Sequence, residues 1–592
     1  MKISPKHIIF FLLIALLTLP VIQHGLKIFV IRPLDGDYSL TQRPQYTITA
    51  WMDGSFQNQF DRYLEDHIGF RPFFVRLYNQ MDFTFFKKAN AEGIVIGKNN
   101  MLYEYDYIRA LNGEDFIGKA ALDKKLSRFR FLQQHLKTNF DIDLLLILEP
   151  SKARTYPDNI PKHYKKAEKS LSNYQYIAAR VNELEINHLD LNHFFLKVKD
   201  TATYPVYPLY GTHWSEYTMT YVADTMMRFL ENLRQIDMPE FRVSEVKMSD
   251  TLNFGDFDSG RTLNLLFRPH HQPMPYPVFA FENDPSKTRP MVLVVSDSYY
   301  WNLFNTRIPQ NLFANEAFWY FNAKVYPDFY YSEKWTSDLD LRTEIEKQDI
   351  IILSVTERFL YKMDWNFIDQ AFGLYAPQYT GDIVYQFENQ LRLNAGWFDD
   401  VLAKAAQQKV PLEEAIRREA YFQAWVQQPE TFLTWYGPDH YRSVILGDSI
   451  WSAEIRKKAV ANGIGFEKQL TDDADYVFEN EHPGLFKLNR LINKYIEAIS
   501  ADAEWLGVIS AKAAGFYMPV EEMIKIDAEY MARQEMSANS GMDEKIRYYE
   551  QAIKDDPAWL AAITKKAAEQ GKSLDQMIRE DAIYMAEQEN KK

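Results

Sequence analysis

Two residues in this sequence have the types and settings needed for acyl transfer through a serine. Ser298 follows the apolar run Met291–Val295 in the stretch MVLVVSDSYY, which predicts a buried strand that ends in a polar turn. A serine at the carboxyl end of a central strand is where α/β hydrolase-like folds expose a nucleophile. Its hydroxyl attacks an acyl carbon only when a base takes the proton, and histidine does this near neutral pH. The best candidate for that base is His213, in the sequence GTHW.

Two further buried strands are predicted to accompany the strand that precedes the serine. The runs Ile142–Leu148 and Asp349–Ser354 are apolar, and a helical pattern over 215–230 follows the histidine. Apolar strands separated by helical stretches predict a parallel sheet in an α/β sandwich. Ligands bind at the carboxyl ends of such strands. Lys152 and Arg358 stand just past two of these ends, so we expect them at the substrate, although each can instead pair with a neighbouring glutamate.

Composition excludes several other kinds of chemistry. The chain has 592 residues, too many for one hydrophobic core, so two or more domains are expected. Its net charge of −14 argues against a nucleic-acid partner. The absence of cysteine excludes disulfides, thiolate metal sites and a cysteine nucleophile. The twelve histidines are scattered, and we predict neither a metal site nor a cofactor.

The N-terminus has the pattern of a membrane-targeting segment. Lys2 and Lys6 precede the apolar run Ile8–Ile22, and no small-x-small cleavage site follows it. We therefore predict an uncleaved, single-pass signal anchor over residues 1–30, with the lysines inside and the rest of the chain outside the cytoplasm. A cleaved signal peptide is the alternative.

A 54-residue period runs through the last third of the chain. Tryptophans recur at this spacing, each with an N-cap residue three positions earlier, alanines at +8 and +23 and an aromatic residue at +25: Trp397, Trp451, Trp505 and Trp559. Four copies in one register predict a helical repeat array over 386–592, with three short helices per unit, such as 544–554, 559–570 and 574–587. Such arrays usually present a binding surface, and we expect a protein partner there. Ser449, in a second Gly-Asp-Ser sequence, follows the repeat's N-cap Asp448 and is not expected to be a nucleophile.

Several short blocks outside the repeats resemble one family. They occur in the order found in the SGNH-hydrolase-like proteins of alginate and related polysaccharide O-acetylation (the AlgJ/AlgX or DHHW type) and cover roughly residues 45–370. The blocks are DHIGFR (66–71), GKNNMLY (97–103), Pro150-Ser151-Lys152 with Tyr156-Pro157, Thr212-His213-Trp214, and Asp297-Ser298-Tyr299. The resemblance implies a three-layer SGNH-hydrolase-like sandwich, which we assign to residues 31–385.

The resemblance also implies roles for four of these residues. Ser298 corresponds to the acyl-accepting nucleophile and His213 to its base, and we expect Trp214 and Tyr299 beside them as substrate contacts. The family carries its acid two residues before the histidine, where this chain has Gly211.

The missing acid needs a substitute, because it orients the imidazole and stabilises the imidazolium. Glu216, one helical turn after the histidine, is the nearest carboxylate in sequence and the first candidate. Asp297, beside the serine, and Glu357, at the end of the next strand, are alternatives.

The implied activity is that of a membrane-anchored O-acetyltransferase acting outside the cytoplasm. The resemblance implies a location at the inner membrane with the catalytic domain in the periplasm, a polysaccharide as acceptor and a membrane-bound O-acyltransferase as the source of acetyl groups. Two alternatives stay open: an esterase that removes such groups, and a catalytically impaired scaffold that binds polysaccharide or export machinery.

Overall fold

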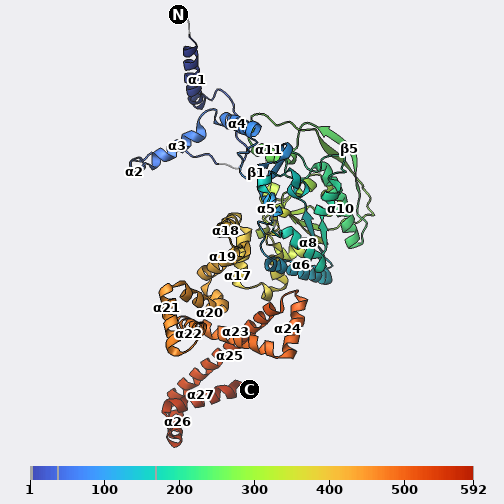
Figure 1. Cartoon of the computed structure of the whole chain (residues 1–592). Helices are drawn as coiled ribbons and strands as arrows, with labels where there is room; N and C mark the ends of the chain where they lie inside the picture. Colours follow the sequence, from blue (N-terminus) through green and yellow to red (C-terminus); the bar gives the residue numbers. More distant parts are fainter. Residues whose placement is uncertain (1–3, 37–38, 167–169, 591–592) are drawn as a thin grey trace. The chain divides into compact units, whose positions relative to one another are not determined.

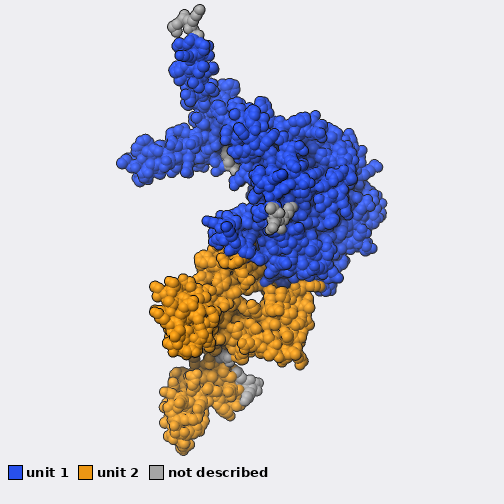
Figure 2. Space-filling view, viewed as in Figure 1, with its two compact units in different colours: residues 1–375, 392–413 blue, residues 376–391, 414–592 orange. Residues whose placement is uncertain are grey.

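The computed structural model describes residues 4–36, 39–166 and 170–590, so Lys2 of the predicted anchor lies outside the described residues. The chain divides into two compact units, residues 1–375 with 392–413 and residues 376–391 with 414–592 (Figure 2). The domain boundary expected at residue 385 falls inside helix α17 (Ile383–Leu393).

A mostly parallel sheet of six strands forms the centre of the first unit. Five strands are parallel, and β9 runs antiparallel at one edge. The three predicted strands lie side by side at its centre, and every residue in them is buried. The order is β4 (His188–Asp190), β3 (Asp143–Glu149), β10 (Ile350–Thr356), β7 (Val292–Ser296), β8 (Ala317–Tyr320) and β9 (Lys324–Tyr326). With its helices, this sheet confirms the predicted α/β class.

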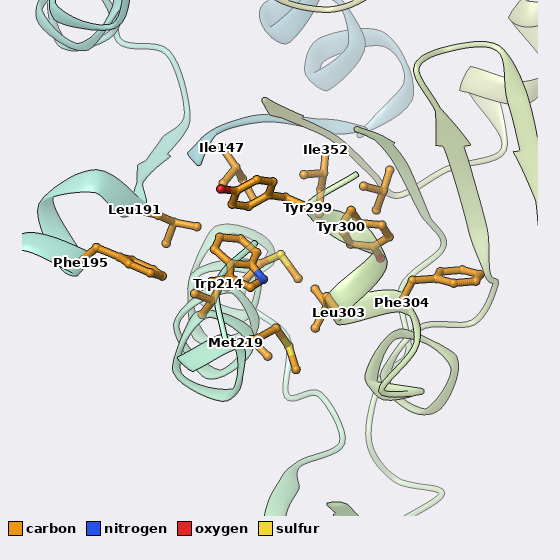
Figure 3. Packing of buried hydrophobic residues seen from close by; sticks show 14 of the residues in the cluster. Ile147, Leu191, Phe195, Trp214, Met219, Tyr299, Tyr300, Leu303, Phe304 and Ile352 are labelled. Atoms are coloured by element: carbon orange, nitrogen blue, oxygen red, sulfur yellow. The ribbon is translucent and has the colours of Figure 1, made fainter. Parts of the chain in front are cut away.

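Helices connect and cover these strands. Helix α6 packs against β3 and α16, whereas Ile147 of β3 and Ile352 of β10 point into the apolar cluster that includes α9, α10 and α12 (Figure 3). The predicted helix after the histidine is α10, capped by Ser215, whose hydroxyl accepts from the Thr218 N–H. The helices of this sandwich are α5 (Tyr105–Leu111), α6 (Lys119–Phe140), α7 (Lys152–Thr155), α8 (Asn173–Glu183), α9 (Leu191–Val198), α10 (Glu216–Arg234), α12 (Tyr300–Phe304), α13 (Ile308–Leu312), α14 (Phe329–Ser332), α15 (Leu341–Glu346) and α16 (Phe367–Tyr375).

Two antiparallel ribbons accompany this sheet, one before its first strand in the chain and one between β4 and β7. One joins β1 (Ile94–Ile96) to β2 (Leu102–Glu104), and the other joins β5 (Phe241–Ser249) to β6 (Met274–Phe281). The long connection within the second ribbon contains the short helix α11 (Asp258–Thr262). This connection supplies a residue of the candidate site.

The N-terminal segment begins with one helix long and apolar enough to cross a membrane. Helix α1 (Pro5–Leu26) has 22 residues and a mean hydropathy of 2.2 over its most apolar window, of which 6% is buried. Such a helix is consistent with a signal anchor or a signal sequence. It is followed by α2 (Ile48–Met52), α3 (Ser55–His67), α4 (Arg71–Met81) and the π-helix η1 (Asp82–Phe86).

Helices in the last third of the chain recur with the 54-residue period. The first helices of the repeats begin at residues 395, 449, 503 and 557, and the second begin at 412, 466, 520 and 574. In the third repeat, two of the predicted short helices are joined into the 36-residue α25. The junction in this copy lacks the proline that opens a new helix in the earlier copies, where it is Pro429 or Pro483. The helices are α18 (Ala395–Gln408), α19 (Leu412–Gln427), α20 (Pro429–Gly447), α21 (Ser449–Asn462), α22 (Phe466–Glu481), α23 (Pro483–Ala501), α24 (Ala503–Gly515), α25 (Val520–Asp555), α26 (Pro557–Gln570) and α27 (Leu574–Asn590).

Candidate active site

The structure brings Ser298 and His213 together and adds a carboxylate behind the imidazole. Ser298 Oγ lies 2.9 Å from His213 Nε2, and His213 Nδ1 lies 2.6 Å from Asp258 Oδ2. Because an ionised carboxylate only accepts hydrogen bonds, Nδ1 carries the proton and Nε2 is left to accept from the serine hydroxyl. The His213 and Asp258 side chains are each 14% exposed, and Ser298 is half-buried.

The turn that carries Ser298 is fixed by its neighbour Asp297. One oxygen of this fully buried carboxylate accepts from the Tyr299 N–H at 3.0 Å. The other accepts from the N–H and hydroxyl of Thr356, at the end of β10. Asp297 therefore holds the end of β7 against the end of β10, which places the serine at the carboxyl ends of the central strands.

The carboxylate behind the imidazole is Asp258 and not the predicted Glu216. Glu216 Oε1 accepts instead from the side-chain amide of Asn253 at 2.5 Å, and burial raises the pKa of Glu216. The second oxygen of Asp258 accepts from the Thr212 N–H at 2.8 Å, so one carboxylate binds both the histidine and the residue before it. The prediction for Glu216 was wrong because sequence proximity selected a carboxylate on α10, whereas the acid belongs to α11.

Gly211 shows why the acid cannot occupy its usual place. A Cβ atom at residue 211 would lie 2.1 Å from the carbonyl oxygen of Gly255 and 2.9 Å from the backbone of Asp256. The connection that leads into α11 therefore fills the space where an Asp-x-His aspartate would stand. The glycine in the sequence was a signal of this close backbone approach, but it did not reveal which segment approaches.

Glu357, the other alternative, is engaged elsewhere. It pairs with Arg154 and accepts from the Ser151 hydroxyl at 2.7 Å. Arg358, expected at the substrate, forms an ion pair with Glu104, and its guanidinium lies 4.8 Å from the centre of the Tyr107 ring.

Lys152 holds the histidine loop and does not face a substrate. The residue is 3% exposed, and its ammonium donates to the carbonyl oxygens of Pro208, Leu209 and Gly211 at 2.6, 3.0 and 2.8 Å. Burial lowers the pKa of Lys152 to about 7, although the nearby carboxylates of Asp258 and Glu104 favour its charged form. The predicted substrate contact instead holds the backbone at Gly211, two positions before His213.

Trp214 and Tyr299 are also buried, which corrects their expected role as substrate contacts (Figure 3). Their ring centres lie 5.1 Å apart, and the Tyr299 ring lies 4.8 Å from the His213 ring. The Tyr299 hydroxyl donates to the Thr212 carbonyl at 2.9 Å. These two side chains therefore support the imidazole from the core.

The acid segment contains a second buried carboxyl group. Burial raises the pKa of Asp256 to about 6, although the Tyr276 hydroxyl donates to it at 2.6 Å. Among the described residues, no group of three or more His, Cys, Asp or Glu side chains could hold a metal ion.

Comparison with known proteins identifies this part of the chain. Residues 94–286, which include His213 and Asp258, match the family model described as the SGNH hydrolase-like domain of the acetyltransferase AlgX. This segment is therefore similar to that domain, which confirms the resemblance seen in the sequence. Ser298 lies 12 residues beyond the matched range.

Solved structures that are similar to part of this chain include proteins of Pseudomonas and Bacillus. The O-acetyltransferase domain of Pseudomonas putida AlgJ is 15% identical, with 48% of this chain and 99% of that chain covered and a TM-score of 0.30. Pseudomonas aeruginosa AlgX is also 15% identical, with coverages of 48% and 66% and a TM-score of 0.33. Bacillus cereus PatB1 is 11% identical, with coverages of 41% and 90% and a TM-score of 0.24. No curated protein sequence matches the chain significantly.

Proposed function

We propose that this chain is an extracytoplasmic O-acetyltransferase that carries an acetyl group on Ser298 and passes it to a hydroxyl of a polysaccharide. The observation that carries the proposal is the continuous hydrogen-bonded series from Asp258 through His213 to Ser298, with distances of 2.6 and 2.9 Å. The AlgX-type domain supports acetyl as the group transferred.

The reaction divides into two displacements at the same serine. In the first, Ser298 Oγ attacks the acetyl carbonyl while His213 Nε2 takes its proton, and the donor leaves with that proton. In the second, an acceptor hydroxyl attacks the acetyl-serine, His213 takes the hydroxyl proton, and Ser298 leaves as it regains a proton. Asp258 keeps the proton on Nδ1 and stabilises the imidazolium that forms in both steps.

The scaffold alternative rested on the missing acid and on the added helical array, and the carboxylate of Asp258 beside His213 argues against the first of these grounds. The esterase alternative differs only in the second step, where water replaces the sugar hydroxyl. The resemblance to polysaccharide acetylation proteins favours transfer. In this proposal α1 anchors the chain in the inner membrane, a membrane-bound O-acyltransferase supplies acetyl groups in the periplasm, and the repeats bind a protein partner.

A trapped acetyl-enzyme tests the proposal. The full chain is incubated with p-nitrophenyl acetate, quenched in acid and digested, and the peptide containing Ser298 is examined by mass spectrometry for one acetyl group. We expect acetylation in the wild type and in Ser449→Ala, a control in the other Gly-Asp-Ser sequence, and none in Ser298→Ala. An unmodified wild-type peptide, or equal release of p-nitrophenol by Ser298→Ala, contradicts the proposal.

The same assay separates transfer from hydrolysis. With a polysaccharide added, we expect the acetyl group to leave Ser298 faster and to appear on the sugar. Loss to water at an unchanged rate favours the esterase.

A further inference from the structure

Helix α4 presents its apolar side to the outside of the protein. Its large exposed residues fall at helical spacing on one face, and two more follow in η1: Phe73, Phe74, Leu77, Tyr78 and Met81, then Phe85 and Phe86, both 72% exposed. A surface helix of a soluble protein normally buries this stripe. An exposed patch of this kind marks a surface that contacts another apolar phase or partner.

The polar side of the same helix faces the protein. The Asn79 amide donates to the Leu263 carbonyl at 2.9 Å, and the Gln80 side-chain oxygen accepts from the Phe267 N–H at 3.0 Å. Just beyond the helix, the buried carboxylate of Asp82 accepts from the amide of Asn90 at 2.9 Å. Helix α4 is therefore inverted, with hydrogen-bonding groups inside and apolar groups outside.

This inverted helix starts against the last turns of α1 (Figure 1). A hydrogen bond of 2.7 Å joins His24 Nδ1 to the carbonyl of His67, at the end of α3. Between α3 and α4, a Cβ atom on Gly69 would lie 2.3 Å from the Pro20 carbonyl oxygen, so the backbones are in direct contact. A 22-residue helix is about 33 Å long, which matches the hydrocarbon thickness of a bilayer. Once α1 spans a membrane, α4 therefore begins at the level where α1 leaves the hydrocarbon.

Positive charge gathers beside this surface, although the whole chain carries −14. The charged residues that line a cavity of about 290 Å³ are four arginines and one aspartate, which pairs with the first and third of the arginines: Arg32, Arg76, Arg261, Arg268 and Asp35. Arg76 belongs to α4, and Lys87 and Lys88 directly follow η1. An apolar face with a basic border is the arrangement that binds the headgroup region of anionic lipids.

We propose that the face formed by α4 and η1 lies in the outer headgroup layer of the bilayer that α1 spans, with the arginine-lined cavity at the level of the lipid phosphates. The occupant of the face is phospholipid, because the face is continuous with the end of α1 and bordered by cations. The proposal rests on the anchoring by α1 that is part of the proposed function, and it does not depend on the acyl-transfer chemistry.

Site-specific fluorescence tests this placement, and the lack of cysteine makes the labelling free of background. Single cysteines at Phe74 and Phe85 in the full chain carry an environment-sensitive NBD label, with Tyr331→Cys, at an 88% exposed position, as the control. The chains are placed in nanodiscs of phosphatidylcholine and phosphatidylglycerol without other proteins. Lipids that carry a spin label in the headgroup region are expected to quench the fluorescence at positions 74 and 85 at least several-fold more than at position 331. Equal quenching at all three positions overturns the proposal, as does protection that arises only after a second membrane protein is added.

The unmodified chain offers an independent measurement. Met81 in α4 is 49% exposed and Met248 in β5 is 51% exposed, so peroxide should oxidise them at similar rates in the absence of lipid. In nanodiscs we expect Met81 to be oxidised several-fold more slowly than Met248, as measured by peptide mass spectrometry. Equal rates in nanodiscs contradict the proposal and cannot be ascribed to a misfolded variant.

Discussion

The candidate active site and the helical repeats are built on opposite principles. In the repeats a contact occurs several times at one spacing: a tyrosine hydroxyl donates to a glutamate 40 residues later in Tyr441–Glu481, Tyr495–Glu535 and Tyr549–Glu589. In the site each contact occurs once and joins residues from separate segments, at 213, 258 and 298. The repeats therefore distribute their stability over several equivalent contacts, whereas the geometry of the site depends on contacts that each occur once.

Loss of the acid should have the largest effect. Asp258→Asn leaves the imidazole without a carboxylate to fix its tautomer, and we expect kcat for acetyl release from p-nitrophenyl acetate to fall by roughly 10³ to 10⁴-fold. Glu216→Gln is the matched control, because its side chain contacts Asn253, and it should stay within about two-fold of the wild type. A similar loss in both variants would contradict the assignment of Asp258.

Moving the acid back to its usual place should fail. Gly211→Asp forces a Cβ atom toward the Gly255 carbonyl, displaces the histidine loop and should lower kcat/KM by about 100-fold or more. The double variant Gly211→Asp with Asp258→Gly should not recover activity. Recovered activity would show that the connection before α11 can move aside. It would also show that the site does not depend on the single contact between Asp258 and His213.

The buried carboxyl of Asp256 should make stability depend on pH. Its folded-state pKa of about 6 exceeds the ordinary value of 3.8, so the folded protein keeps a proton that the unfolded chain has lost between about pH 4 and pH 6. The wild type therefore loses stability as the pH rises through this range, by at most about 3 kcal/mol. Asp256→Asn should remove this loss, gaining thermal stability over the wild type at pH 7 but not below pH 4. The same difference in melting temperature between the variant and the wild type at both pH values would contradict this role of Asp256.

In the repeats, overpacking should destabilise without affecting chemistry. The alanine at position +23 is fully buried in all four copies, and Ala474→Leu adds three carbon atoms at a closed interface. We expect the free energy of unfolding of the repeats to fall by about 2 kcal/mol, measured by denaturant titration, with acetyl release unchanged. An equal loss of activity would show that the two regions are not independent.

Removal of one repeated hydrogen bond should have the smallest effect. Tyr441→Phe deletes a 2.6 Å bond to Glu481 but keeps the buried ring, and should lower the unfolding free energy by about 1 kcal/mol. A loss several times larger would mean that this copy bears more of the stability than its equivalents.

The same contrast explains what could be predicted from the sequence. Helix starts in the repeats follow from the 54-residue spacing, because each copy repeats the same caps and buried alanines. The central strands follow from apolar runs, since both faces of a parallel sheet are buried. Ser298 was predicted to lie at the site because it follows an apolar strand, and His213 because it precedes a helical pattern.

Other site features depend on contacts that leave no local pattern. Asp258 lies 45 residues after the histidine, inside a connection between two ribbon strands, and no periodicity marks it. Lys152 and Trp214 were assigned to the substrate from their neighbours in sequence, but the packing of the 208–214 segment buries both. Burial of a polar residue past a strand end depends on which loop covers it, and the sequence contains no signal of that loop.

The acid's origin in α11 has a consequence for how chains of this kind are recognised. A pattern that requires Asp-x-His would discard this protein, although its carboxylate stands at the imidazole in the required geometry. A better criterion is a glycine two residues before the histidine together with an aspartate inside the next ribbon connection. Under that criterion, chains set aside as lacking a complete triad become candidates for biochemical assay.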